Sequence, residues 1–250
     1  MNGRNSLVDN IELSGAIDNI SGDHNWAGIR FDGGATGNHI VRNSFFHDND
    51  NGFLGGAATD AVLVEGSKFE HLGRDGFAHG MYMGVGQKFI LRNSVVTSNK
   101  NDGHLVKTRA LANTIECNMI AGLNGQNSYA VDVPQGGDTV IRNNVIQNGP
   151  NANNRNAFVD YQEEGAVNPI SNLSVHDNTL INDTPMAYFF WLPRSPNLVG
   201  WANNLLVGGG TPFNPGGSST TGVTQKTRAD AGLPPYDGTL ASLPAAPFCN

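Results

Sequence analysis

The stretch Val140-Ile141-Arg142-Asn143-Asn144-Val145-Ile146 carries the pattern that decides the fold. Residues with high β propensity are followed by small polar residues and then by an apolar pair. Asn and Gly tolerate a positive φ angle, so the polar centre predicts a sharp bend between two short strands. The phrase recurs along the chain, which makes it a structural repeat and not an isolated turn.

Other copies of the phrase follow at nearly constant distances. They are 39–46, 62–69, 90–96, 114–120, 173–180 and 201–206, with Asp18-Asn19-Ile20 as the candidate for a degraded first copy. Alignment on the small polar residue gives one column, Ser44, Ser67, Ser94, Asn118, Asn144, Asn178 and Asn204, with steps of 23, 27, 24, 26, 34 and 26 residues. This period, in segments rich in β-formers and broken by Gly and Asn, predicts coils of three short strands. Insertions should lie in turns, the longest between Asn144 and Asn178.

These features predict an all-β fold, a single-stranded right-handed parallel β-helix (a solenoid) of about eight coils over residues 1–207. The Asn side chains of the column are expected to stack as an amide ladder that satisfies the turn backbone. Residues 208–250 are rich in Gly, Pro, Ser and Thr. They are expected to form an irregular C-terminal cover over the last coil, with one short helix near 227–232.

Composition and charge narrow the classes of function. The 250 residues carry a net charge of −7 and no basic run, which disfavours a nucleic-acid partner because phosphate binding needs clustered Lys and Arg. No apolar stretch is long enough for a membrane span, and no apolar leader follows Met1. Cys117 and Cys249 are expected to be one buried thiol and one thiol in the tail.

A second strand recurs before each copy of the phrase. Its alignment places Gly55, Met83, Lys107, Asp132 and Asp160 in one column, and Leu54, Tyr82, Val106, Val131 and Val159 in the next. Strand side chains alternate between faces, so the apolar column should face the core and the charged column should point into an outer groove. The outward face would then also carry Phe53, Met81, Leu105 and Phe158, as the floor of the groove.

Further polar residues gather around Lys107, Asp132 and Asp160. Arg109 lies on the same face, Tyr129 begins the strand of Asp132, and His79 and His104 stand where their coils enter this strand. Glu163 and Glu164 follow Asp160 in a turn and could supply oxygen ligands for Ca²⁺; no other cofactor is indicated. Asp132 and Asp160 should lie about 5 Å apart, so that one carboxyl has a raised pKa. The alternative is a surface ion-pair ladder that adds little energy.

At these residues the sequence resembles the carbohydrate-active right-handed β-helix superfamily of pectate lyases, alginate lyases and mannuronan C5-epimerases. Tyr129-Ala130-Val131-Asp132-Val133-Pro134 looks like the Tyr-x-x-Asp-Pro-His motif of the epimerases. Tyr129 and Asp132 match the motif, whereas its His is missing. His79 or His104 is the candidate to supply an imidazole from a preceding coil.

The resemblance implies a secreted enzyme, extracellular or periplasmic, that acts on an acidic, uronate-containing polysaccharide by abstracting the C5 proton. Lys107 or Arg109 would neutralise the uronate carboxylate. His79 or His104 would be the base and Tyr129 the acid, or Tyr129 would do both, while Asp132 orients its neighbours. Arg109, Asp160 and Glu163 are the expected substrate-binding residues.

Two other classes of function stay open at this point. A glycoside hydrolase on the same fold would use Asp132 and Asp160 as its acid and its nucleophile or base, and a separation near 5 Å would favour retention of configuration. A non-enzymatic solenoid, such as a tailspike segment, an adhesin or a carbohydrate-binding surface, fits the low charge and the regular Asn turns equally well.

Overall fold

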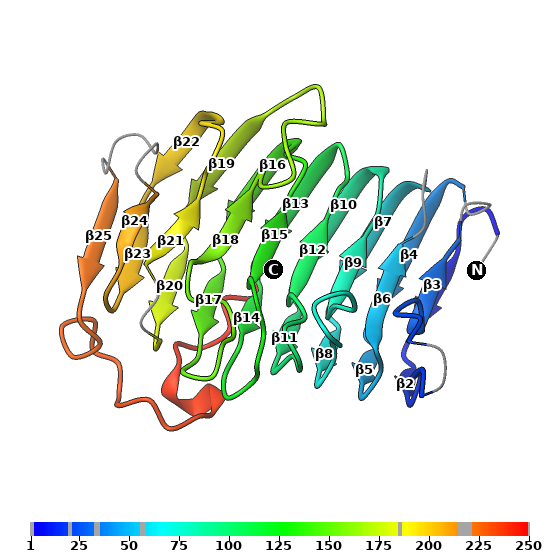
Figure 1. The fold of residues 1–250 in the computed structure, drawn as a ribbon, viewed down its shortest axis with the longest axis horizontal. Helices are drawn as coiled ribbons and strands as arrows, with labels where there is room; N and C mark the ends of the chain where they lie inside the picture. The colour runs from blue at the N-terminus through cyan, green and yellow to red at the C-terminus, as the bar shows by residue number, and fades with distance from the viewer. Residues whose placement is uncertain are drawn as a thin grey trace.

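The chain forms a parallel β-solenoid in which every coil contributes one strand to each of three parallel sheets (Figure 1). The computed structural model describes residues 3–19, 22–32, 36–55, 59–184, 187–214 and 222–249. The sheets contain eight, nine and eight strands, which make about seven turns. The predicted all-β solenoid is therefore confirmed.

The strands follow one another through the three sheets in chain order. The first sheet contains β1 (Leu7–Asp9), β4 (Asn38–Arg42), β7 (Thr59–Glu65), β10 (Gly86–Arg92), β13 (Ala112–Glu116), β16 (Asp138–Arg142), β19 (Asn172–His176) and β22 (Asn197–Ala202). The second contains β2 (Glu12–Ser14), β5 (Phe45–His47), β8 (Lys68–Glu70), β11 (Val95–Thr97), β14 (Met119–Ala121), β17 (Val145–Asn148), β20 (Thr179–Asn182), β23 (Asn204–Val207) and β25 (Val223–Lys226). The third contains β3 (Ala27–Phe31), β6 (Asn51–Gly55), β9 (Met81–Met83), β12 (Val106–Thr108), β15 (Val131–Val133), β18 (Ala157–Tyr161), β21 (Tyr188–Trp191) and β24 (Thr211–Phe213).

A single left-handed residue makes the bend between the first and second sheets. Asn43, Gly66, Asn93, Cys117, Asn143, Asp177 and Asn203 have φ angles between 50° and 60°. Each stands directly before a residue of the predicted Ser/Asn column. Gly, Asn and Asp adopt this conformation at little cost, which explains the recurring phrase. Cys117 is the exception in this series.

The Ser/Asn column forms a continuous hydrogen-bonded ladder, as predicted. Asn118 donates its backbone N–H and its side-chain amide to Asn144 Oδ1, both at 3.0 Å, and Asn144 bonds to Asn178 in the same way. The side chain of Asn144 also donates to the Ile115 carbonyl. Serine hydroxyls take the acceptor role in the earlier coils, and the Ile11 N–H donates to Ser44 Oγ. The first rung is therefore at Ile11 and not at Asp18–Asn19, while Ile20 lies outside the described residues.

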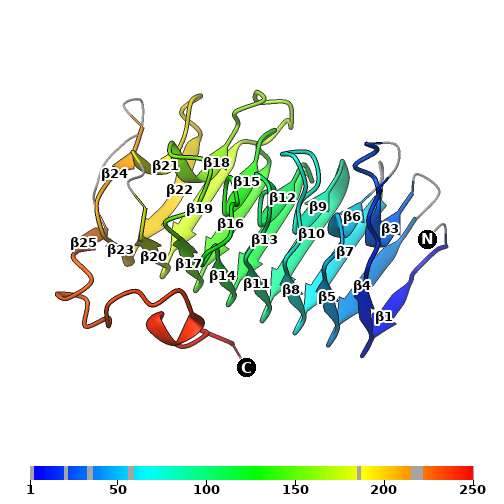
Figure 2. The ribbon, with the colours of Figure 1, turned by 60° about the horizontal axis from the view of Figure 1, so that its bottom comes forward.

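The C-terminal part of the chain extends the sheets and then turns back. β24 and β25 continue the third and second sheets beyond residue 207. The C-terminal strap, residues 227–249, runs back along the outer face of the second sheet (Figure 2). It lies beside the coils and does not close over the last one. Residues 227–232 form turns and not the expected helix, because Gly232 and the prolines after it interrupt the bonding.

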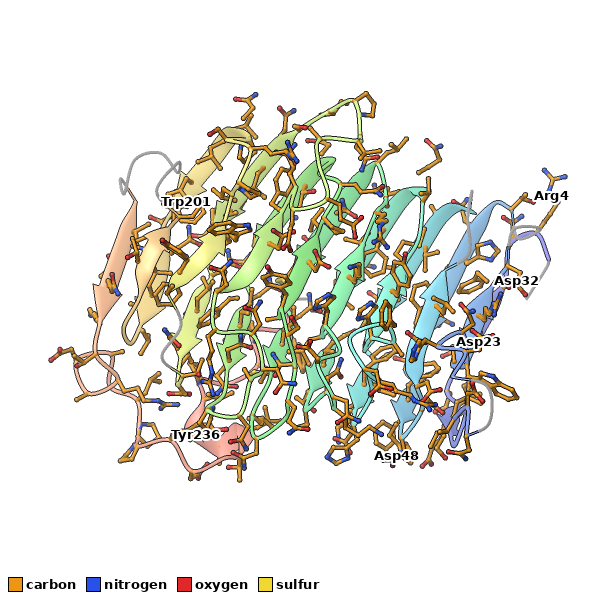
Figure 3. The ribbon with its side chains drawn as sticks, viewed as in Figure 1. Arg4, Asp23, Asp32, Asp48, Trp201 and Tyr236 are labelled. Atoms are coloured by element: carbon orange, nitrogen blue, oxygen red, sulfur yellow. A yellow bond between two sulfur atoms is a disulfide. The ribbon has the colours of Figure 1, made fainter. Side chains whose placement is uncertain are left out.

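The strap is anchored by polar contacts and by a disulfide. Arg228 Nε lies 2.7 Å from Asp183 Oδ1, and the Tyr236 hydroxyl (Figure 3) donates to Asn124 Oδ1 at 3.3 Å. Cys249 is bonded to Cys117. The expectation of two separate thiols was wrong, because the strap brings the tail back to the bend at Cys117. The helical element among the described residues is the short 3₁₀ helix η1 (Leu240–Ser242). A helix with the length and apolar character of a membrane span is not found in this part of the chain.

Candidate active site

The outer face of the third sheet brings most of the predicted site residues into one column. The strand register aligns Arg30, Leu54, Tyr82, Lys107, Asp132, Asp160 and Trp191 on successive coils. Lys107, Asp132 and Asp160 are thus neighbours across three coils, as predicted. Tyr82 takes the place in this column that the sequence alignment gave to Met83, and Leu54 the place given to Gly55.

Tyr82, and not Met83, lies in the outer column because successive side chains of a strand point to opposite faces. Met81 and Met83 both point into the core, and Met81 is in register with Val106 and Phe53. The side chain between them, Tyr82, must then point outward. Val106 and Val131 are fully buried in the core, which confirms the predicted parity of the charged column. Phe53, Met81, Leu105 and Phe158 belong to the core and do not line a groove.

The charged column does not lie in an open groove. The long insertion between Asn144 and Asn178 forms the loop from β18 to β19, which rises beyond the neighbouring turns in Figure 1. Asn168 on this loop donates to the carbonyls of Ala110 and Gly136, which ties the loop to the connections that follow β12 and β15. Asp132 and Asp160 are 2% and 0% exposed, so they form the floor of the site.

The floor is formed by two neighbouring acids, Asp132 and Asp160 (the acid pair). Burial, followed by the charges of Asp132 and Glu163, raises the pKa of Asp160 to about 9, and Asp160 is hydrogen-bonded to the Asp132 side chain. Asp132 Oδ2 lies 2.8 Å from Lys107 Nζ. The Oδ1 atoms of both acids have no N–H donor among the described residues. The raised pKa of Asp160 favours its protonated form, whose O–H can be donated to the Asp132 side chain.

His79 and His104 belong to a second ladder, at the entrance to the third sheet. Asn51 Oδ1 accepts the His79 N–H at 2.8 Å, His79 Nδ1 accepts the His104 N–H at 3.1 Å, and His104 Nδ1 accepts the Tyr129 N–H at 3.2 Å. Because each Nδ1 is an acceptor, the neutral ring carries its proton on Nε2. Burial lowers the pKa of His79 well below its usual value and that of His104 to about 4.

This ladder gives both histidines a structural role that sequence reasoning missed. At neutral pH each ring has only an N–H to offer, and His104 Nε2 lies 3.3 Å from Asp132 Oδ2. Such a ring can position a carboxylate more readily than it can accept a proton from a substrate. The predicted role of His79 or His104 as a base is therefore less favoured by the geometry than a positioning role.

Tyr129 stands beside the acid pair and stays protonated. Burial, together with the charges of Asp160 and Glu163, raises its pKa above the usual value, and its hydroxyl is hydrogen-bonded to Glu163 and Asn156. The side chain is 7% exposed, whereas Glu163 is exposed. A tyrosine in this state has a proton to donate and cannot remove one, but its raised pKa makes it a weak acid that gives up its proton only to a strongly basic atom.

The rim of the site is a carboxylate cradle formed by Lys107, Arg109 and Gln135. Two nitrogens of Arg109 donate hydrogen bonds to the Glu164 carboxylate, and Arg109 Nε lies 3.0 Å from Glu164 Oε2. Gln135 Nε2 donates to the same oxygen at 3.3 Å, and Lys107 Nζ lies 3.7 Å from Oε1. Burial acts to raise the pKa of Glu164, but the bond from Arg109 and the two cationic charges outweigh it, so the pKa is lowered.

Tyr82 is the functional candidate that sequence reasoning missed. Arg109 donates a hydrogen bond to its hydroxyl, and the guanidinium carbon lies 5.0 Å from the ring centre. Tyr82 is half-buried and precedes Lys107 in the outer column, and its bond to Arg109 places its hydroxyl at the rim. Met81 and Met83 are two residues apart and therefore share one face of the strand. This pattern was the sequence signal that Tyr82, between them, points outward if both methionines are in the core.

At the other end of the column, Trp191 is in register with Asp160. Its ring centre lies 5.8 Å from that of Tyr188, and both rings are half-buried, while Phe189 and Phe190 between them are in the core. The outer face thus continues from the cradle, over the acid pair, to an aromatic surface. Among the described residues, no group of three or more His, Cys, Asp or Glu side chains is placed to hold a metal ion.

Comparison of the chain with protein-family models, with curated proteins and with solved structures finds no match in any of the three. Function must therefore be argued from the site itself.

Proposed function

We propose that this protein is an enzyme that acts on uronate-containing polysaccharide by acid–base chemistry at C5, either as a β-elimination lyase or as a C5-epimerase. The observation that carries the proposal is the cradle of Lys107, Arg109 and Gln135, which binds both oxygens of a carboxylate beside an acid pair. A uronate carboxylate takes up negative charge when C5 loses its proton. Fixed cations at that position stabilise the transition state more than the ground state.

The proposal gives each group on the rim a role. Lys107 and Arg109 neutralise the uronate carboxylate, and Arg109 can bind it through two parallel hydrogen bonds. The Tyr82 oxygen, which accepts a hydrogen bond from Arg109, first loses its own proton to solvent and then takes the proton from C5. In β-elimination the C5 electron pair forms the C4–C5 double bond, the C4–O4 bond breaks, and Tyr129 gives its proton to O4; in epimerisation Tyr129 gives it to C5 on the opposite face. Solvent then returns a proton to Tyr129 and takes the one on Tyr82. Asp132 and His104 position Lys107 from below.

Burial favours this proposal over a glycoside hydrolase built on Asp132 and Asp160. A hydrolase needs both carboxyl groups in contact with the glycosidic bond, but these two are almost fully covered. The Glu164 side chain on the rim is 38% exposed, and the Arg109 and Lys107 side chains beside it are 16% and 11% exposed. A saccharide would therefore meet the cradle first.

The cysteine pair supports an extracellular or periplasmic location as part of the proposal. Disulfides persist in oxidising compartments and are rare in the reducing cytosol. An acidic extracellular polysaccharide would be a fitting substrate there. The net charge of −7 repels polyanions at long range, so the local cations of the cradle would have to provide the attraction.

A panel of polymannuronate, polyguluronate, polygalacturonate and neutral glycans tests the proposal through three products. An unsaturated sugar with ultraviolet absorbance identifies a lyase, and deuterium exchange at C5 identifies an epimerase. New reducing ends without absorbance identify a hydrolase. Turnover of neutral glycans only, or of nothing, would contradict the proposal.

Variants connect the product to the rim. Tyr82→Phe should lower turnover by about 10²–10⁴-fold, the usual contribution of a positioned acid or base. Lys107→Ala should also lower it strongly, because charge stabilisation is lost. Tyr236→Phe on the strap is the matched control and should keep full activity. Full activity of Tyr82→Phe would remove its proposed role.

A further inference from the structure

Both cations of the carboxylate cradle are already neutralised within the chain. Lys107 pairs with Asp132 at 2.8 Å, and Arg109 pairs with Glu164 through two nitrogens. A uronate carboxylate arriving here would be a third anion for two cations, in a site that is largely shielded from water. Like charges at such distances repel strongly when solvent cannot screen them. One resident carboxylate must therefore leave when a uronate binds.

The two resident carboxylates differ in their freedom to move. The Asp132 side chain is 3% exposed, whereas that of Glu164 is 38% exposed and extends from a turn. The turn is fixed by its backbone, since the Glu164 N–H donates to the Pro134 carbonyl at 2.9 Å and the Gly165 N–H to the Gln162 carbonyl at 3.1 Å. A change of the Glu164 rotamer into solvent therefore leaves the turn in place.

We propose that the Glu164 carboxylate occupies the position of the substrate's uronate carboxylate, and that binding exchanges one for the other on Arg109, Lys107 and Gln135. This inference rests on the proposed function and explains how the same site would select carboxylated saccharides. A neutral sugar cannot replace the charge of Glu164, so the exchange favours carboxylated saccharides. Only molecules whose Glu164 side chain has turned into solvent can bind the saccharide, so the apparent affinity for the saccharide is reduced by their fraction.

Calorimetric titration of the whole chain with trimers of galacturonate, mannuronate, guluronate and glucuronate tests the exchange. Glu164→Gln removes the competing charge with little change of shape. It should bind the accepted uronate trimer at least about 10-fold more tightly than the wild type, a gain of about 1.4 kcal/mol. Binding of a neutral galactose trimer should stay unchanged. Glu65→Gln is the matched control, because Glu65 also pairs with an arginine, at 2.7 Å, but on the first sheet.

The outcomes separate this inference from the proposed function. Tighter uronate binding by Glu164→Gln without turnover by the wild type would keep the exchange and reject the enzyme. Turnover by the wild type with equal or weaker binding by Glu164→Gln would reject the exchange and keep the enzyme. Failure of every uronate trimer to bind either protein would overturn both the exchange and the proposed function. A gain in affinity of Glu65→Gln equal to that of Glu164→Gln would overturn the exchange alone.

Discussion

The Ser/Asn ladder at the first bend and the outer column of the third sheet run along the same coils with the same spacing, but they pair their polar atoms differently. In the ladder, like residues stack, and each Asn amide bonds both to its neighbour and to a backbone carbonyl. In the outer column a lysine, two aspartates and a tryptophan follow one another, and the Oδ1 atoms of both aspartates have no N–H donor among the described residues.

The difference indicates which column stabilises the fold and which column is the candidate for chemistry. A satisfied ladder lowers the free energy of every coil and has nothing left to offer a ligand. A buried column with two acids, one of them protonated, is costly, and such arrangements gather at functional sites. Breaking each column should therefore give a distinct result.

The largest loss of stability is expected from Asn144→Ala. The change removes bonds to Asn118, Asn178 and the Ile115 carbonyl at a buried position. Each unsatisfied buried group costs about 1–3 kcal/mol, so the free energy of unfolding should fall by about 4 kcal/mol. Denaturant unfolding measures it. Asn153→Ala, on an exposed turn, should change it by less than about 0.5 kcal/mol. A small effect of Asn144→Ala would mean that the ladder is not stabilising.

A somewhat smaller loss is expected from Lys107→Met in the outer column. The variant keeps the length of the side chain but leaves the buried Asp132 without its cation. Removal of one partner of a buried pair costs about 3 kcal/mol or more. Unfolding at pH 7 tests this value. If Lys107→Met were as stable as the wild type, the column would be wet and the pair weak.

The acid pair predicts a pH dependence that the ladder lacks. Asp160 has a folded pKa of about 9, above its unfolded value near 4. Between these values the folded state binds the proton that the unfolded state has lost, so stability falls as pH rises from about 4 to 9. Asp160→Asn removes this contribution. The wild type should lose about 1 kcal/mol per pH unit relative to Asp160→Asn between pH 6 and pH 8. Parallel curves would show that Asp160 is ionised.

The smallest effect is expected on the outer face of the first sheet. Arg142 pairs with Glu116 at 2.6 Å, but the arginine side chain is 45% exposed. Exposed ion pairs contribute about 0–1 kcal/mol. Arg142→Gln should therefore lower stability by less than about 1 kcal/mol, and high salt should erase the difference. A loss comparable to that of Lys107→Met would remove the contrast between covered and exposed pairs.

The ladder could be predicted from the sequence from Ser44 onward, though not its first rung at Ile11, and the outer column could be predicted only in part. Asn-Ser and Asn-Asn pairs mark a left-handed residue followed by a ladder residue, so both the bend and the stacking could be predicted. The register of Met81-Tyr82-Met83 could not, because all three residues look apolar and a shift by one residue reverses every side chain. The sequence of the insertion between Asn144 and Asn178 also did not indicate that its loop would bond to the Ala110 and Gly136 carbonyls.

Other features depend on contacts that no local pattern reveals. His79 and His104 looked like candidate bases because their place in a hydrogen-bonded series appears only when the coils are stacked. Cys117 and Cys249 are 132 residues apart, and their bond depends on the strap returning along the second sheet. Cys117 at a position otherwise held by Gly, Asn or Asp was the local anomaly that marked it.

The strap has a consequence for the cooperativity of the fold. In a solenoid each coil contacts only its neighbours, so coils can unfold one after another from the ends. Here Arg228 bonds to Asp183, the Asn93 side chain bonds to the Cys249 backbone, and the disulfide closes on Cys117. The coils from Asn93 onward are thus joined into a closed ring of contacts. They should exchange their amide hydrogens as one unit, while the earlier coils open independently of them.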